Sequence, residues 1–157
     1  MLLGLIERPT RDLDVIALIK SGRYVKASRL PAPLVQAVAE VGQVLQLGPD
    51  WINAGPADLL DFGLPTGFAG RTEVRRYGSL TLHIAARVDQ VALKLYAAAD
   101  LGRRSKHFQD LQALQPTREE LVAAARWAVT QDPSEGFRSL LVNALAAMEV
   151  TDGDSFV

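Results

Sequence analysis

The chain of 157 residues contains no cysteine and no apolar run long enough to cross a bilayer as a helix. The lack of cysteine excludes disulfide bonds, a thiolate nucleophile and a zinc site with thiolate ligands. The 12 glycines and 8 prolines are scattered without period, which excludes a collagen-like chain. A hydrophobic content of 48% excludes a disordered one. The first residues do not match a signal peptide, so we expect a cytoplasmic globular protein that does not enter a membrane.

Basic residues are missing from a central segment, although the net charge of the chain is only −1. Residues 31–70 contain four acidic residues and no Lys or Arg, and residues 111–157 contain seven acidic and three basic residues. Residues 1–30 and 71–110 have the opposite balance, with six basic against three acidic residues and eight against four. If the two basic segments fold together, they create a positive field suited to phosphates. Otherwise they are ordinary solvated surfaces.

Apolar spacing predicts strands in the first half of the chain and helices in the second. Residues 13–19 form an apolar run typical of a buried strand, and Ser21-Gly22 indicates a turn. Residues 71–77 and 79–85 flank Gly78 as a β-hairpin. We expect helices from Pro31 to Gly48-Pro49, over 87–101 before Gly102, over 106–114, from Thr117 with Glu120 in a capping box, and over 134–148.

These elements predict an α+β fold, with a small mixed β-sheet and a helical carboxyl-terminal half. We expect a single domain, in which residues 1–86 contain the sheet, residues 87–150 are helical and residues 151–157 form a flexible tail. Trp51 and Trp127 are expected in packing contacts rather than as platforms for stacked bases.

Two carboxylates lie two residues apart in the segment RPTRDLD, where the first strand begins. In an extended chain Asp12 and Asp14 point to the same face, where they repel each other unless a cation lies between them. Mg²⁺ accepts one or two carboxylates together with substrate phosphates, and Arg8, Thr10 and Arg11 could contact the phosphate oxygens. The alternative is structural, with Asp12 capping a turn and Asp14 paired with a nearby arginine.

The segment RPTRDLD followed by an apolar strand resembles the nucleotidyltransferase fold superfamily, and most closely the bacterial minimal nucleotidyltransferases and abortive-infection toxins of the AbiEii type. The resemblance implies that Asp12 and Asp14 bind Mg²⁺ (or Mn²⁺), which activates an NTP for transfer of NMP to a hydroxyl group. The acceptor would be an RNA, such as tRNA, or a protein. A toxin of this group would also have an antitoxin protein as its partner.

Residues 91–100 and 103–111 resemble later motifs of the toxin group, so the resemblance covers about residues 8–114. In those motifs a lysine inside a helix precedes a basic segment that ends in Asp-Leu, and Lys94 and Asp110 occupy these places. The resemblance therefore implies a catalytic role for both. The alternatives are a surface lysine and an exposed helical carboxylate next to Lys106.

Further charged residues complete the candidate site. Arg104 and Lys106 belong to the basic segment RRSKH, which holds a triphosphate or an RNA backbone if it is not simply a solvated loop. Asp110 would complete the acidic cluster. Glu73 is the only acidic residue of the hairpin, and we favour a surface position facing Arg75 or Arg76 for it.

One element of the superfamily is missing, because no Gly-Gly or Gly-Ser precedes Asp12 and the only upstream glycine is Gly4. In the superfamily this turn brings backbone N–H groups close to the triphosphate. A shortened chain, a misassigned start codon and a degenerate member would each explain the difference. Two hypotheses follow: a Mg²⁺-dependent nucleotidyltransferase, or a catalytically inactive nucleotide-binding or protein-interaction module that retains the fold.

Overall fold

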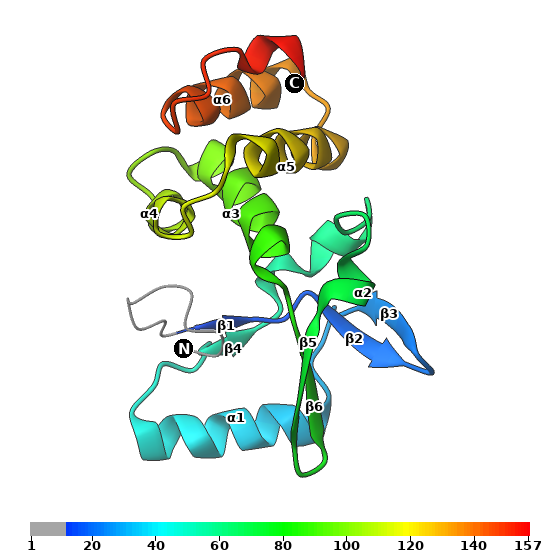
Figure 1. Ribbon diagram of the computed structural model, residues 1–157. Coiled ribbons are helices and arrows are strands. Elements are labelled where there is room, and N and C mark those ends of the chain that lie inside the picture. The colour runs from blue at the N-terminus through cyan, green and yellow to red at the C-terminus, as the bar shows by residue number, and fades with distance from the viewer. Residues whose placement is uncertain (1–11) are drawn as a thin grey trace. The chain divides into compact units, whose positions relative to one another are not determined.

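A computed structural model describes residues 12–157, which belong to two compact units (Figure 1). We call the described residues 12–64 the amino-terminal unit and residues 65–157 the carboxyl-terminal unit. Both units combine helices with short strands, so the chain has a mixed α/β fold. The units divide near residue 65, whereas the sequence suggested a change from sheet to helices near residue 86. Each unit is described by itself.

The amino-terminal unit contains two pairs of short strands and one long helix. Its elements are β1 (Leu13–Asp14), β2 (Ala17–Lys20), β3 (Arg23–Lys26), α1 (Ala32–Leu45), β4 (Ile52–Asn53) and the 3₁₀ helix η1 (Gly55–Leu60). Strand β1 pairs in parallel with β4, and β2 pairs antiparallel with β3.

The prediction of one buried strand over residues 13–19 is wrong, because the chain changes its pairing partner within this segment. Val15 still donates its N–H to the Asn53 carbonyl at 2.7 Å, but from Ala17 onward the chain pairs with β3. The turn at Ser21 and Gly22, where φ is 50° and 75°, folds β3 back onto β2 as expected. The result is two short, half-exposed strands.

Helix α1 confirms the expected helix after Pro31, and it ends one residue before Gln46, which is left-handed with φ 54°. Trp51 packs against this helix, and its indole N–H donates to the Val38 carbonyl at 2.9 Å. A Cβ atom at Gly42 would lie 3.2 Å from the Trp51 Nε1 atom, so glycine permits this close approach. Trp51 therefore has the packing role that the sequence indicated.

The carboxyl-terminal unit consists of one β-hairpin and a group of packed helices. Its elements are α2 (Phe68–Arg71), β5 (Glu73–Tyr77), β6 (Leu80–Ile84), α3 (Arg87–Leu101), α4 (Lys106–Ala113), α5 (Arg118–Gln131), α6 (Glu135–Ala146) and the 3₁₀ helix η2 (Gly153–Ser155). The hairpin around Gly78 and the four longer helices confirm the predicted elements within a few residues, including the capping box of Thr117 and Glu120.

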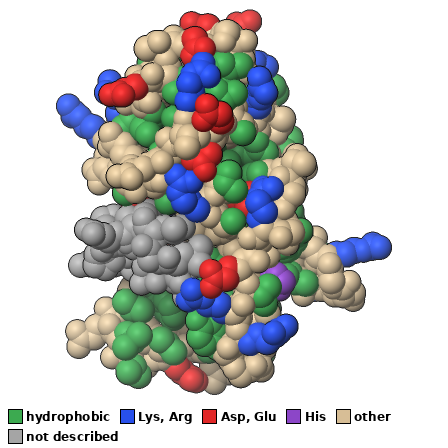
Figure 2. All heavy atoms as spheres, in the orientation of Figure 1, with side chains coloured by type: hydrophobic (Ala, Val, Ile, Leu, Met, Phe, Trp, Pro, Cys, Tyr) green, Lys and Arg blue, Asp and Glu red, His purple; other side chains and the backbone are tan. Residues whose placement is uncertain are grey.

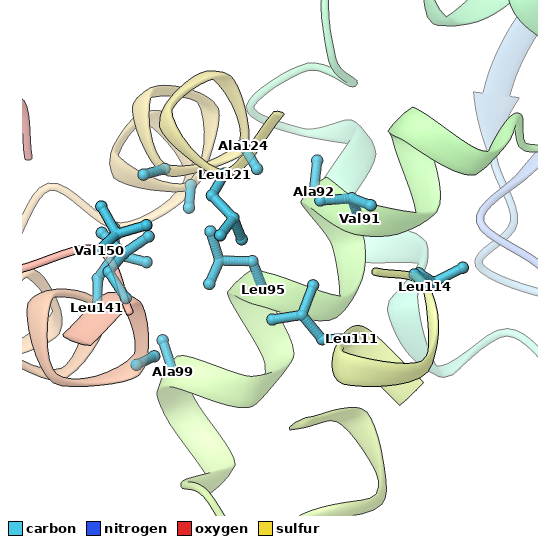
Figure 3. Packing of buried hydrophobic residues seen from close by; sticks show 14 of the residues in the cluster. Val91, Ala92, Leu95, Ala99, Leu111, Leu114, Leu121, Ala124, Leu141 and Val150 are labelled. Carbon is cyan, nitrogen blue, oxygen red and sulfur yellow. The ribbon is translucent and has the colours of Figure 1, made fainter. Parts of the chain in front are cut away.

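The core of this unit lies among helices α3 to α6 (Figure 3). Leucines from each helix face one another there: Leu95, Leu111, Leu121 and Leu141 are all at most 2% exposed. Tyr96 and Trp127 pack against the same cluster, edge to face with their ring centroids 6.1 Å apart.

The carboxyl-terminal tail, which we expected to be flexible, has a regular place in the structure. Gly153 is buried in η2, and Phe156 and Val157 pack against the helical core. The short 3₁₀ helix thus brings the last two apolar residues onto the core. A segment of seven residues is too short for its apolar spacing to predict this packing.

The strands of residues 12–157 form three separate pairs rather than one sheet. The structure therefore does not confirm the single mixed sheet of the nucleotidyltransferase type that we expected. Two pairs, β2 with β3 and β5 with β6, are antiparallel strands joined by a tight turn, and the third is the parallel pair of β1 with β4. Every one of these strands has at most five residues.

An ion pair fastens the start of α3 to α5. Arg87 donates from Nη1 to the Glu120 Oε1 atom at 2.5 Å, and it also donates to the Leu114 carbonyl from Nη2 at 2.7 Å. The hydrogen bond from Arg87 holds the pKa of Glu120 below its ordinary value. A carboxyl group whose pKa is lower in the folded than in the unfolded chain stabilises the fold at pH values above its unfolded-state pKa. This contribution is lost as the pH falls through its folded-state pKa.

We therefore expect Glu120→Gln to be less stable than the wild type at neutral pH, by up to about 1 kcal/mol, and the difference to disappear in acid. Glutamine keeps the capping box with Thr117, so the variant removes only the charge. Urea unfolding at pH values from about 7 down to about 3 measures the difference. A difference that is the same at every pH would contradict the role of the ion pair.

Candidate functional site

Asp12 and Asp14 flank Leu13 at the short strand β1. Both residues are exposed, whereas Leu13 between them is half-buried. This alternation is the geometry expected of a strand, in which side chains two residues apart point to the same side. This exposure pattern is the one that the predicted orientation of the two carboxylates would produce, and the orientation itself stays a prediction.

Asn53 holds the Asp14 carboxylate from the neighbouring strand. The parallel register places Asn53 beside Asp14, and its Nδ2 donates to the Asp14 Oδ1 atom at 2.9 Å. The Asn53 Oδ1 atom in turn accepts the Gly55 N–H at 2.8 Å, which fixes the orientation of the amide. A Cβ atom at Gly55 would lie 2.9 Å from that Oδ1 atom, so glycine permits this contact.

Sequence reasoning did not identify Asn53. The parallel pairing of β4 with β1 links residues 39 positions apart. No local pattern predicts such a pairing for strands of two residues. The one local feature that could have pointed to Asn53 is its polar side chain at the end of β4.

The donor set of this region suits a metal ion shared with a substrate. Carboxylate and amide oxygens are ligands for hard cations, and Mg²⁺ usually keeps several positions for water and substrate phosphates. Within residues 12–157, no group of three or more His, Cys, Asp or Glu residues is arranged to hold a metal.

If Asp14 is a metal ligand, Asn53→Ala should weaken Mn²⁺ binding about tenfold or more, because groups that orient a metal ligand commonly contribute that much. The variant frees the Asp14 carboxylate without changing either charge. The number and affinity of bound Mn²⁺ ions can be measured by electron paramagnetic resonance. Gln36→Ala is the matched control, since its amide donates to Glu40 on the exposed surface of α1 at 2.8 Å. Equal Mn²⁺ affinity in both variants would contradict a positioning role for Asn53.

Lys94 and Asp110 meet in the carboxyl-terminal unit, although they come from different helices. The Lys94 Nζ atom on α3 donates to the Asp110 Oδ2 atom on α4 at 2.8 Å. The Asp110 side chain is only 3% exposed, and that of Lys94 is 24% exposed. Asp110 is therefore not the exposed helical carboxylate of the structural alternative. The structure pairs two residues that the family resemblance had selected independently.

The other predicted residues have varied positions. Arg104 and Lys106 are exposed around the start of α4, where Ser105 caps the helix by accepting the Phe108 N–H at 3.2 Å. Arg8, Thr10 and Arg11 lie outside the described residues. Glu73 accepts a hydrogen bond from Arg75 at 2.7 Å on the surface of the hairpin, as the sequence favoured.

A second buried carboxylate escaped the sequence analysis. Asp89, in the first turn of α3, is fully buried and accepts hydrogen bonds from the Arg71 Nη2 and Nε atoms at 2.5 and 3.2 Å. Arg71 also donates from Nη1 to the Thr66 carbonyl at 2.7 Å. We had placed Arg71 in the hairpin, whereas it ends α2. This arginine ties the segment before the hairpin to the first helix of the core.

No protein-family model matches the chain, and no curated protein and no solved structure is significantly similar to it. Among residues 12–157, no helix combines the length and the apolar character that crossing a membrane requires.

Proposed function

We propose that the chain is a Mg²⁺-dependent nucleotidyltransferase that moves NMP from an NTP to a hydroxyl group of RNA or protein. The observation that supports it most is the pair of exposed carboxylates at β1, one of them oriented by Asn53. This arrangement provides the ligands that a metal-bound triphosphate needs. The proposal includes the finer fold assignment, a nucleotidyltransferase core.

The reaction assigns a definite task to each carboxylate. The acceptor oxygen forms a bond to the α-phosphorus, the bond from that phosphorus to the bridging oxygen breaks, and pyrophosphate leaves while the hydroxyl proton passes to solvent. Asp12 and Asp14 would hold the Mg²⁺ ion, which offsets negative charge on the phosphates when bound. Most of the rate enhancement in such transfers comes from positioning and charge compensation.

The family resemblance assigns to Lys94 the task of offsetting charge on the phosphates, and within the carboxyl-terminal unit Asp110 accepts a hydrogen bond from it. An ammonium group has three N–H donors, and Asp110 receives one of them at 2.8 Å. Because Asp110 is buried, it fixes the direction of the partly exposed ammonium. Arg104 and Lys106 add positive charge on the exposed surface near the start of α4 and would attract phosphate groups.

The family resemblance also suggests a biological setting for the reaction. A chain of this kind would be the toxin of a toxin–antitoxin pair and would bind its antitoxin as a protein partner. The acceptor in that setting would be an RNA such as tRNA, or a protein.

The second candidate is a catalytically inactive module that binds nucleotides or proteins and retains the fold. The two candidates differ in one reaction. Incubation with a mixture of α-labelled NTPs, Mg²⁺ or Mn²⁺ and cellular RNA and protein should label an acceptor with the wild-type chain and not with the Asp12→Ala, Asp14→Ala variant. Equal labelling by both chains, or none by either, would contradict the proposed enzyme.

A further inference from the structure

The β-hairpin of the carboxyl-terminal unit extends away from the helical core of that unit (Figure 1). Its strands β5 and β6 pair only with each other, and no backbone hydrogen bond within residues 12–157 joins either of them to another element. Among the described residues of this unit, no helix packs extensively against the hairpin. A two-stranded hairpin is only marginally stable by itself, whereas a sheet of three or more strands with an apolar face is stable. Further strands would therefore stabilise it.

The two edges of the hairpin differ in charge. Strand β5 contains Glu73, Arg75 and Arg76, and charged side chains commonly protect an edge strand against pairing with another chain. Strand β6 has the sequence Leu-Thr-Leu-His-Ile, without Lys, Arg, Asp, Glu or Pro. Figure 2 shows hydrophobic side chains at many places on the surface, so exposure alone does not select an edge. The lack of charge and of proline selects the edge of β6.

The sequence of β6 is complementary to itself when a second copy runs in the opposite direction. If the two strands are centred on Leu82, this residue faces Leu82 of the second copy. Leu80 then faces Ile84, and Thr81 faces His83. Apolar side chains meet apolar ones, the hydroxyl group meets an imidazole with which it can form a hydrogen bond, and no like charges face each other. The pairing has a two-fold axis, which is the commonest symmetry of homo-oligomers.

The backbone of β6 fits the same register. Tyr77 and Leu80 face each other across a two-residue turn, and a turn of this kind joins its flanking residues by a hydrogen bond. Hydrogen-bonded positions alternate along antiparallel strands, so we expect the backbone groups of Thr81 and His83 to point to the free edge. Each Thr81 can then exchange two hydrogen bonds with His83 of the second copy. Leu82 lies between them at a non-hydrogen-bonded position, where facing side chains are closest.

We propose that the free edge of β6 binds a second copy of this chain. The two β6 strands pair antiparallel about Leu82 and form a four-stranded sheet in the order β5-β6-β6-β5. The charged strands β5 then lie at both outer edges, so the sheet stops at four strands and the assembly is a dimer rather than a fibre. Because the contact is confined to one strand of each copy, association is weak and depends on protein concentration. The inference is independent of the proposed function.

Sedimentation equilibrium of the full chain over a range of concentrations measures the association. Thr81→Pro removes an N–H group from the free edge and leaves the bonds to β5 in place, since proline is tolerated where an edge strand faces solvent. Arg76→Pro is the matched control, because Arg76 faces Thr81 across the hairpin and its N–H points to the opposite edge. We expect the wild type and Arg76→Pro to dimerise alike. Thr81→Pro should dimerise at least about tenfold more weakly, because the symmetric dimer loses one hydrogen bond from each copy.

The lack of cysteine allows a second test, which reports the register of the two strands. In Leu82→Cys the new thiol faces its own copy at a non-hydrogen-bonded position, where Cα atoms are about 4.5 Å apart and a disulfide can form. Thr81→Cys is at a more exposed position, but it faces His83 rather than itself. We expect mild oxidation to link Leu82→Cys chains to one another. Thr81→Cys should form a linked dimer only when it is mixed with His83→Cys.

A chain that stays monomeric at every attainable concentration would overturn the inference. So would equal dimerisation of Thr81→Pro and the wild type, or linkage of Thr81→Cys to itself as fast as that of Leu82→Cys, because either result would assign the contact to another surface. The two tests change different residues. If circular dichroism shows that one variant is misfolded, the other test still decides. Neither readout involves a nucleotide or a metal, so both are independent of label transfer.

Discussion

Replacing Asp14 by Asn is expected to lower the rate of nucleotidyl transfer at least about a thousandfold. Asparagine has the size of aspartate and can still meet the Asn53 amide, but it brings no charge to a Mg²⁺ ion. The proposed mechanism depends on that charge, because the metal compensates negative charge on the triphosphate during transfer. Asp12→Asn should have an effect of the same order, since the proposal assigns both exposed carboxylates to the metal.

The same substitution should leave the fold nearly unchanged. Asp14 is exposed, and exposed substitutions usually alter the free energy of unfolding by no more than about 0.5 kcal/mol. Glu40→Gln is the matched control, because it removes an exposed carboxylate from the same unit at α1. Activity and urea unfolding of all three variants separate chemistry from stability. Full activity of Asp14→Asn, or an equal loss in Glu40→Gln, would refute the assignment.

Replacing Arg71 by Met should destabilise the carboxyl-terminal unit by about 3–5 kcal/mol. Asp89 is fully buried and receives two hydrogen bonds from Arg71. Without the arginine, its carboxylate stays in the interior with no opposite charge, and burying an uncompensated charge is costly. Asp89→Leu together with Arg71→Met should recover much of the loss, because apolar replacements of both partners leave no buried charge.

Urea unfolding followed by the fluorescence of Trp127 measures this effect in the unit that contains the pair. Trp51 lies in the other unit, so a Trp51→Phe background leaves one reporter. Arg75→Met is the control, since its ion pair with Glu73 lies on the surface of the hairpin, where water and salt screen it and its contribution to stability is small. A double variant as unstable as Arg71→Met would show that the two residues do not act through each other.

Local signals made the helices predictable, and long-range pairing made the strands unpredictable. The ends of α3 and α5 follow from residues within one turn, such as Gly102 at φ 80° and the capping box of Thr117. The change of partner after Asp14 depends on β4, which is 39 residues away, and on a strand of two residues. The apolar pattern of residues 13–19 is the same for one long strand as for two short ones, so it could not predict the change of pairing partner.

The candidate site shows the same division. The orientation of Asp12 and Asp14 followed from strand geometry, and the family resemblance selected Lys94 and Asp110 before the structure paired them. Asn53 could not be predicted, because its role comes from the register of β1 against β4. Asp89 was missed for a different reason: a carboxylate in the first turn of a helix usually lies in solvent, and its burial depends on Arg71 from another element.

The most direct test of nucleotidyl transfer compares two positions of the label in the same NTP. The full chain is incubated with Mg²⁺, cellular RNA and protein, and the NTP labelled at either the α- or the γ-phosphate. The account predicts that an acceptor gains the α-label, that the γ-label appears only in pyrophosphate, and that both signals vanish in Asp12→Ala, Asp14→Ala. Transfer of the γ-label to an acceptor, or no transfer from either substrate, would contradict it.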